Sequence, residues 1–232
     1  MKLPTTKTKP KTDFAKMNTL IFSNPKVGKS TFCSHIPGAL FAPTEEGLNY
    51  LEVNRIPLVD RWEQVLDLGR ALAKEDHNYK MVIVDTVDQA FNRCEEYICK
   101  REKAVKISDI DMGAGYAMVK KEFIRVMTKF NSLGLGLVFN SHSKLREVKT
   151  KTLTYTMMDT SLSPGASQAV CGFMDHIFYA YIDEKGKRLM RTKPTKYINA
   201  GDRSGQLPDL IDFRYEVFIK EFNNVVNPKG DK

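Results

Sequence analysis

Hydrophobic and polar positions form two kinds of block along this chain. Short continuous apolar runs predict strands that are buried on both faces of a sheet, at residues 19–22, 39–42, 81–84 and 135–140. Between them, apolar residues recur with helical spacing and predict helices over residues 29–35, 62–74, 87–103 and 115–130. Strands that alternate with helices predict an α/β fold, a mostly parallel sheet with helices on both faces.

After Ser143 the pattern changes to shorter strands that are separated by polar turns. We expect them to form hairpins or a C-terminal antiparallel extension of the sheet, at residues 153–157, 176–181 and 188–191. Residues 1–17 hold two prolines and five lysines against one aspartate, which predicts a flexible basic arm. With a flexible tail at residues 223–232, the chain is expected to form one domain over residues 18–222.

The turn between the first strand and the first helix reads Asn24-Pro-Lys-Val-Gly-Lys-Ser-Thr31. Strand, tight loop and helix in this order are the layout of a P-loop, whose backbone N–H groups and helix N-terminus bind phosphate. Lys29 would add a positive charge at the outer phosphates, and the Ser30 hydroxyl is a ligand that Mg²⁺ accepts. We therefore predict a nucleoside triphosphate site formed by Ser23, Asn24, Pro25, Lys26, Val27, Gly28, Lys29, Ser30 and Thr31.

This P-loop pattern is complete only in its second half. Ser23 stands where the first glycine is usual, and Lys26 stands at a middle position that glycine often holds. The alternative interpretation is a Gly-Lys turn that caps an ordinary helix, with Ser30 or Thr31 as a polar N-terminal residue.

The apolar strand at residues 81–84 ends in Asp85. An acidic residue at the carboxyl end of a buried parallel strand lies beside the P-loop, where it can hold the Mg²⁺ shell together with Ser30. A role for Asp85 as the N-cap of the next helix is the alternative. Both interpretations place Asp85 at the same edge of the sheet.

Polar residues also follow two other predicted strands. Glu45, or in second place Glu46, can orient the water that attacks the γ-phosphate, although a solvated acidic turn is the alternative. His142 follows the strand at residues 135–140 and can sense the γ-phosphate, although a lone histidine is often structural. Lys144 can contact phosphate or nucleic acid.

Composition and charge narrow the class of protein. The chain has 232 residues, 42% hydrophobic, and a net charge of +8, which suits a globular domain with acidic partners. Without a membrane-length apolar run or a signal-peptide core, we expect no membrane association and a cytoplasmic location. Two basic clusters favour nucleic-acid binding. A solvated surface, or contacts to the phosphates of a nucleotide on a neighbouring subunit, are the alternatives. The clusters contain Lys144, Arg146, Lys149, Lys151, Lys185, Lys187, Arg188, Arg191, Lys193 and Lys196.

Over roughly residues 17–215, the chain resembles phage-encoded RecA-like ATP-binding proteins, some of which act in single-strand annealing and recombination. The resemblance rests on the P-loop and on five further segments: Thr44-Glu-Glu-Gly-Leu48, Val82-Ile-Val-Asp-Thr86, Asp111-Met-Gly-Ala-Gly-Tyr116, Phe139-Asn-Ser-His142 and Gly201-Asp-Arg-Ser-Gly205. The segment at residues 111–116 and the turn at residues 201–205 are the more family-like elements.

This resemblance implies a RecA-like P-loop NTPase core that uses ATP with Mg²⁺. It implies catalytic roles for Lys29 at the phosphates, for Glu45 as the hydrolytic glutamate, for His142 as the sensor and for Arg203 as an arginine finger acting in trans. An exposed arginine on a surface turn is the alternative for Arg203. It also implies assembly into a ring or filament on single-stranded DNA, with a single-strand-binding protein as a further partner, in the host cytoplasm. Ser23 departs from the pattern and puts the hydrolysis rate in question more than nucleotide binding.

The hypothesis from the sequence is a DNA-stimulated ATPase of phage recombination or annealing, whose DNA-facing segment is the loop at residues 145–166. The rivals are a replicative helicase or helicase loader, a nucleotide-binding assembly factor with little hydrolysis, and a small-molecule phosphotransferase. The phosphotransferase would need an arginine-rich lid, which the sequence lacks.

Overall fold

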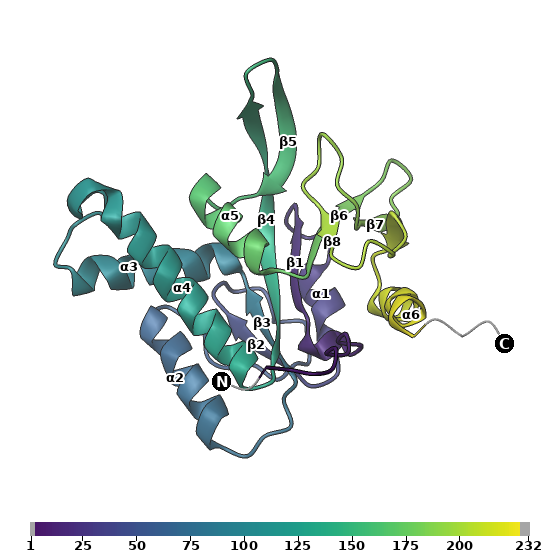
Figure 1. Cartoon of the computed structure of the whole chain (residues 1–232), viewed down its shortest axis with the longest axis horizontal. Coiled ribbons are helices and arrows are strands. Elements are labelled where there is room, and N and C mark those ends of the chain that lie inside the picture. The colour runs from purple at the N-terminus through teal and green to yellow at the C-terminus, as the bar shows by residue number, and fades with distance from the viewer. Residues whose placement is uncertain (1–2, 228–232) are drawn as a thin grey trace.

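The computed structural model describes residues 3–227. Within them a nine-stranded sheet has the order β2-β3-β4-β1-β6-β7-β9, with β5 beside β4 and β8 beside β6 (Figure 1). Its core is parallel and consists of β2 (Ala39–Pro43), β3 (Met81–Asp85), β4 (Gly136–Lys149), β1 (Asn18–Ser23) and β6 (His176–Ile182). The α/β fold with a mostly parallel sheet is thereby confirmed.

The antiparallel strands lie at two places on this core. One is β5 (Thr154–Thr160), which pairs with the second half of β4 and forms a hairpin that projects from the body of the molecule (Figure 1). The other strands extend the sheet beyond β6 and are β7 (Arg188–Arg191), β8 (Gly201–Asp202) and β9 (Leu210–Asp212).

Helices cover both faces because alternate side chains of each core strand point to opposite sides. Val82 and Val84 of β3 join one core with α2 (Trp62–Lys74), α3 (Val87–Arg101), α4 (Ala114–Ser132) and α5 (Pro164–Phe173). Met81 and Ile83 join the other with α1 (Lys29–Ser34), α6 (Tyr215–Val226) and the 3₁₀ turn η1 (Phe14–Lys16). Two more 3₁₀ turns, η2 (Ile107–Asp109) and η3 (Asp111–Gly113), precede α4.

Several elements differ from the predictions. Strand β4 continues to Lys149 instead of ending at residue 140, because its polar second half pairs with β5 outside the core. Strand β6 pairs in parallel with β1 and so belongs to the core, not to an antiparallel extension. Helices α5 and α6 were not predicted.

The boundaries predicted for the arm and the tail are also corrected. Phe14 is buried against Phe218 and Phe222 of α6, so the arm ends before this residue and not at residue 17. Helix α6 runs to Val226, because Phe222 anchors its last turns, so no tail begins at residue 223. Residues 1–2 of the arm and 228–232 of the tail lie outside the described residues.

The parallel core brings the carboxyl ends of β1 and β3 together with the middle of β4 at one edge of the sheet. Asn140 of β4 lies between Ile21 of β1 and Asp85 of β3 in the register of the sheet. The loop after β1, the residue that ends β3 and the residues after Asn140 are therefore neighbours. None of the helices within residues 3–227 has both the length and the apolar composition needed to cross a membrane.

Candidate functional site

The loop between β1 and α1 has the backbone shape that phosphate binding requires. Gly28 adopts a left-handed conformation (φ 113°), which glycine alone accepts without strain, and Lys26 also has a positive φ of 67°. The N–H of Phe32 donates to the Gly28 carbonyl at 2.9 Å, so α1 starts directly after the loop. Because α1 has only six residues, its dipole is small, and the loop amides and Lys29 supply most of the positive potential.

Lys29 is buried, and its ammonium group donates to the Ser23 hydroxyl at 3.0 Å and to the Ser23 carbonyl at 3.4 Å. Burial lowers the pKa of Lys29, while the nearby carboxylate of Asp85 acts in the opposite direction. Among residues 3–227 it forms no ion pair. A buried cation with only neutral hydrogen-bond partners favours an anionic ligand.

The Ser30 hydroxyl donates to the Asp85 carboxylate at 2.6 Å. This contact joins the start of α1 to the end of β3 across the intervening strand β4. Burial raises the pKa of Asp85, against the hydrogen bond from Ser30 and the charge of Lys29. The two oxygens form a ligand pair of the type that Mg²⁺ prefers, so the residues present fit this metal.

Glu45 follows β2 and is held by Thr86, which follows β3, and by His142 of β4. The Thr86 hydroxyl donates to its Oε1 at 2.7 Å, and His142 Nε2 lies 3.2 Å from its Oε2. Thr44, beside Glu45, is fixed in turn, because its hydroxyl accepts from the N–H of Thr86 at 2.7 Å. Glu45 is therefore a positioned carboxylate and not a freely solvated turn residue.

These residues surround a cavity of about 520 Å³, large enough for a triphosphate with its metal. Of the predicted residues it is lined by Pro25, Lys26, Gly28, Lys29, Ser30, Thr31, Glu45, Glu46, Asp85 and His142. The other three P-loop residues do not line the cavity. Val27 packs in the core, Ser23 holds Lys29, and Asn24 accepts a hydrogen bond from the Ser143 hydroxyl at 2.7 Å.

Arg203 lies far from this cavity. It follows β8, which pairs with the first residues of β6, so it lies at the amino edge of the sheet, opposite the P-loop. Its side chain is mostly exposed, donates to the Gly172 carbonyl at 3.0 Å and lies 3.8 Å from the Asp175 carboxylate. It cannot reach the cavity of its own chain, and a role in trans stays a prediction.

Two residues at the site have partners that the sequence did not predict. Arg188, at the start of β7, lines the cavity and lies over Gly28, although the sequence indicated only membership of a basic cluster. Asp88, in the first turn of α3, accepts hydrogen bonds from the His142 N–H at 3.0 Å and from the hydroxyls of Ser141 and Ser161. It is a positioning residue that ties α3 to β4, and only the fold reveals these partners.

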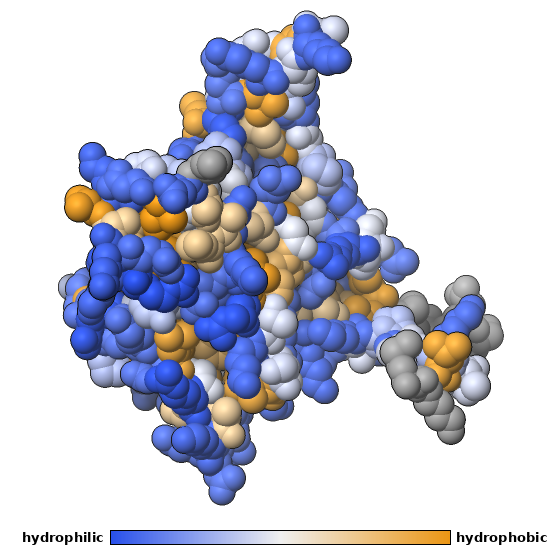
Figure 2. Space-filling model, turned by 60° about the vertical axis from the view of Figure 1, so that its left-hand side comes forward, coloured by the Kyte–Doolittle hydropathy of each residue, from blue (hydrophilic) through white to orange (hydrophobic). Residues whose placement is uncertain are grey.

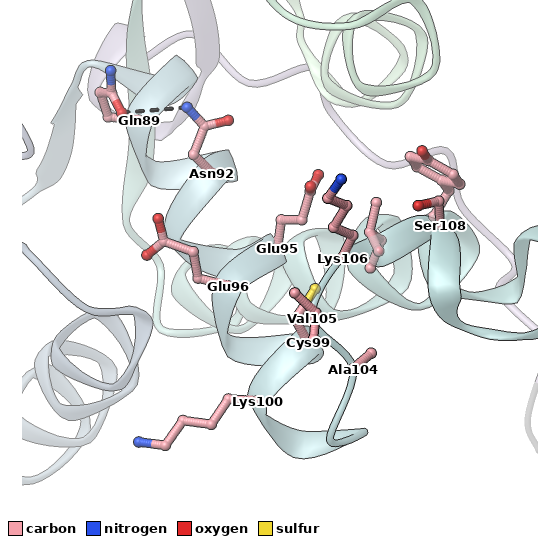
Figure 3. Close-up of a pocket in the computed structure, with 12 residues that line it drawn as sticks. Gln89, Asn92, Glu95, Glu96, Cys99, Lys100, Ala104, Val105, Lys106 and Ser108 are labelled. Carbon is pink, nitrogen blue, oxygen red and sulfur yellow. Dashed lines mark hydrogen bonds between the residues drawn. The ribbon is translucent and has the colours of Figure 1, made fainter.

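A second cavity, of about 740 Å³, is lined by residues of α3, η2 and the start of α4 (Figure 3). Glu95 and Glu96 lie on its wall, and burial together with the charge of Glu96 raises the pKa of Glu95. These carboxylates disfavour a triphosphate. The cavity at the P-loop is the better candidate site.

Comparison with known proteins agrees with this geometry. The model of a family described as AAA domain matches residues 15–204, which include the whole P-loop and the ends of β2, β3 and β4. No curated protein matches the chain.

The buried carboxylate of Asp85 generates a stability prediction. Since its pKa is raised in the folded state, the native protein loses stability as pH rises through this pKa. We expect Asp85→Asn, which keeps an acceptor for Ser30, to raise the thermal unfolding midpoint at pH 7 and to lose that advantage in acid, where the wild-type carboxyl is protonated. Scanning calorimetry across pH measures both midpoints, and a lower midpoint for the variant at pH 7 would contradict the prediction.

Proposed function

The chain belongs to this AAA domain family of P-loop nucleotide-binding ATPases, and on that premise we propose that it is a Mg²⁺-dependent ATPase that acts on single-stranded DNA. The observation that carries the ATPase assignment is the buried Lys29, which forms no ion pair within residues 3–227, beside the Ser30–Asp85 contact. Both features lie at the cavity at the carboxyl edge of the sheet.

Each residue of the site has a role in this proposal. The loop amides and Lys29 bind the phosphates, and Lys29 stabilises the charge that develops during transfer. Glu45, which is fixed by Thr86 and His142, orients the attacking water and accepts its proton. Ser30 and Asp85 would hold Mg²⁺, which would supply positive charge to the phosphate oxygens.

Support for DNA binding comes from the β4–β5 hairpin, whose projecting end is largely hydrophilic (Figure 2). Residues 145–166 form most of this hairpin and the start of helix α5, not the loop expected from the sequence. Lys144 and Lys151 are exposed on the hairpin and available to phosphates. Arg146 is not, because its Nε lies 2.8 Å from the buried Asp159 carboxylate and its Nη2 donates to the Leu162 carbonyl.

Aromatic side chains lie on the same hairpin and next to its free edge. The segment around Tyr197 runs along the free edge of β5, with the N–H of Met158 donating to the Tyr197 carbonyl at 2.7 Å. The ammonium of Lys196 lies 5.5 Å from the ring centre of Tyr155 and 5.4 Å from that of Tyr197, which is 59% exposed. A cation flanked by aromatic rings suits unpaired bases, which stack on such rings with little sequence preference.

A single strand, β4, connects the nucleotide site with the hairpin proposed to bind DNA. His142, which lies against Glu45, and Lys144, on the hairpin, are two residues apart on it. A shift of the hairpin on binding DNA would move His142 and hence Glu45. This continuity supports stimulation of the ATPase by DNA.

Assembly and biological setting are the least direct parts of the proposal. A ring or filament would bring Arg203, at the amino edge of one subunit, toward the nucleotide of the next. The resemblance to phage RecA-like proteins supports a place in recombination or annealing, with a single-strand-binding protein as partner.

The roles of Glu45 and Lys29 are each tested by one variant. We expect Glu45→Gln to bind ATP normally and to lower kcat about 10²- to 10⁴-fold, because it removes the acceptor for the proton. Lys29→Ala should weaken ATP binding roughly ten- to hundredfold, because it removes a charged partner. Calorimetric titration and phosphate release measure both effects. Normal turnover in Glu45→Gln would refute the assignment of the base.

The role of the hairpin is tested by salt dependence. The double variant Lys144→Ala/Lys151→Ala should bind a single-stranded oligonucleotide more weakly and lower the slope of log K against log salt by about 0.7 for each lost phosphate contact. The matched control is Lys74→Ala/Lys129→Ala, which removes the same charge from exposed ends of α2 and α4. Equal loss of affinity in both variants would contradict a specific role for the hairpin.

A further inference from the structure

A groove of about 150 Å³ lies beside the triphosphate cavity, between α1 and the junction of β9 with α6. The two hollows share Gly28, Thr31 and Arg188 in their walls, so they are adjacent. Consider a nucleotide whose outer phosphates lie at Lys29. If its inner phosphate passes Gly28 and Thr31, its nucleoside would reach this groove.

The walls of the groove suit a flat heteroaromatic ring. Phe32 of α1 and Phe213 are stacked with ring centres 4.8 Å apart and 7° between their planes. Tyr215, the first residue of α6, presents its ring edge to Phe32 at 5.8 Å. At the outer end, His35 and Glu216 are exposed and lie 3.7 Å apart, and both offer polar atoms to a ligand. Aromatic walls with a few polar groups at the rim are typical of sites that bind a base.

Arg188 lies at the junction of the two hollows. Its Nη1 is 3.7 Å from the position that a Cβ atom on Gly28 would occupy, so the guanidinium lies directly over the P-loop. It comes from β7, opposite Ile182 of β6, which places it at the same edge of the sheet as the loop. Within residues 3–227 Arg188 forms no ion pair, whereas the neighbouring Lys187 is paired with Asp212 at 2.6 Å.

We propose that this groove binds the base and ribose of the nucleotide, with Tyr215 and His35 as base-contacting residues, and that Arg188 binds a phosphate at its entrance. The inference rests on the proposed function and adds the side of the P-loop on which the nucleoside lies. Arginine suits the entrance because its planar guanidinium pairs with phosphate oxygens through two hydrogen bonds.

The test compares ADP with inorganic pyrophosphate by calorimetric titration of the full chain. Wild type should bind ADP at least tenfold more tightly than pyrophosphate. His35→Trp, which fills the groove from an exposed position, and Tyr215→Ser should abolish that preference and leave the pyrophosphate affinity unchanged. Arg188→Ala should weaken both ligands about tenfold, and Lys187→Ala should weaken neither. Thermal unfolding identifies any variant that fails to fold, and His35→Trp does not depend on replacing a partly buried side chain.

The outcomes for the groove and for the nucleotide site are distinguishable. If folded His35→Trp and Tyr215→Ser retain the ADP preference while Lys29→Ala loses binding, the groove assignment is wrong and the nucleotide site stands. The groove assignment is also wrong if Tyr50→Ala, on the opposite side of the cavity, removes the preference instead. If wild type binds neither ADP nor pyrophosphate, both the proposed ATPase function and the groove assignment are wrong.

Discussion

The hydrogen bond between Ser30 and Asp85 depends on one constraint, the parallel order of β3, β4 and β1. This order brings the end of β3 and the start of α1 to the same edge of the sheet, with only the width of β4 between them. The groups brought together there stabilise the fold poorly, since Lys29 and Asp85 are both buried with pKa values shifted toward their neutral forms. Such a loss of folding stability is typical of functional sites, where a bound ligand supplies the charged partners that the free protein lacks.

The parts of the fold that the sequence predicted are those in which local pattern and burial agree. The bounds of α2 follow from its apolar stripe, and β3 was recognised because a run buried on both faces is continuously apolar. The P-loop residues and Asp85 were located by motif and by their place at strand ends. Their proximity followed from the rule that parallel strands share one carboxyl edge.

The parts that it did not predict depend on partners far away in the chain. The second half of β4 reads as a polar loop, and only its pairing with β5 makes it a strand. Arg146 and Arg188 belong to similar basic clusters, yet one is buried against Asp159 and the other lies over Gly28. Charge along a sequence does not reveal which side chain meets a carboxylate and which stays free for a ligand.

The central claim is that Ser30 and Asp85 form a metal-dependent nucleotide site with Lys29. The affinity of the wild-type chain for ATP, measured by calorimetry with Mg²⁺ and then with excess chelator, tests it most directly. The account predicts at least tenfold tighter binding with Mg²⁺, and loss of that difference in Ser30→Ala. Equal affinities in wild type with and without the metal would contradict it.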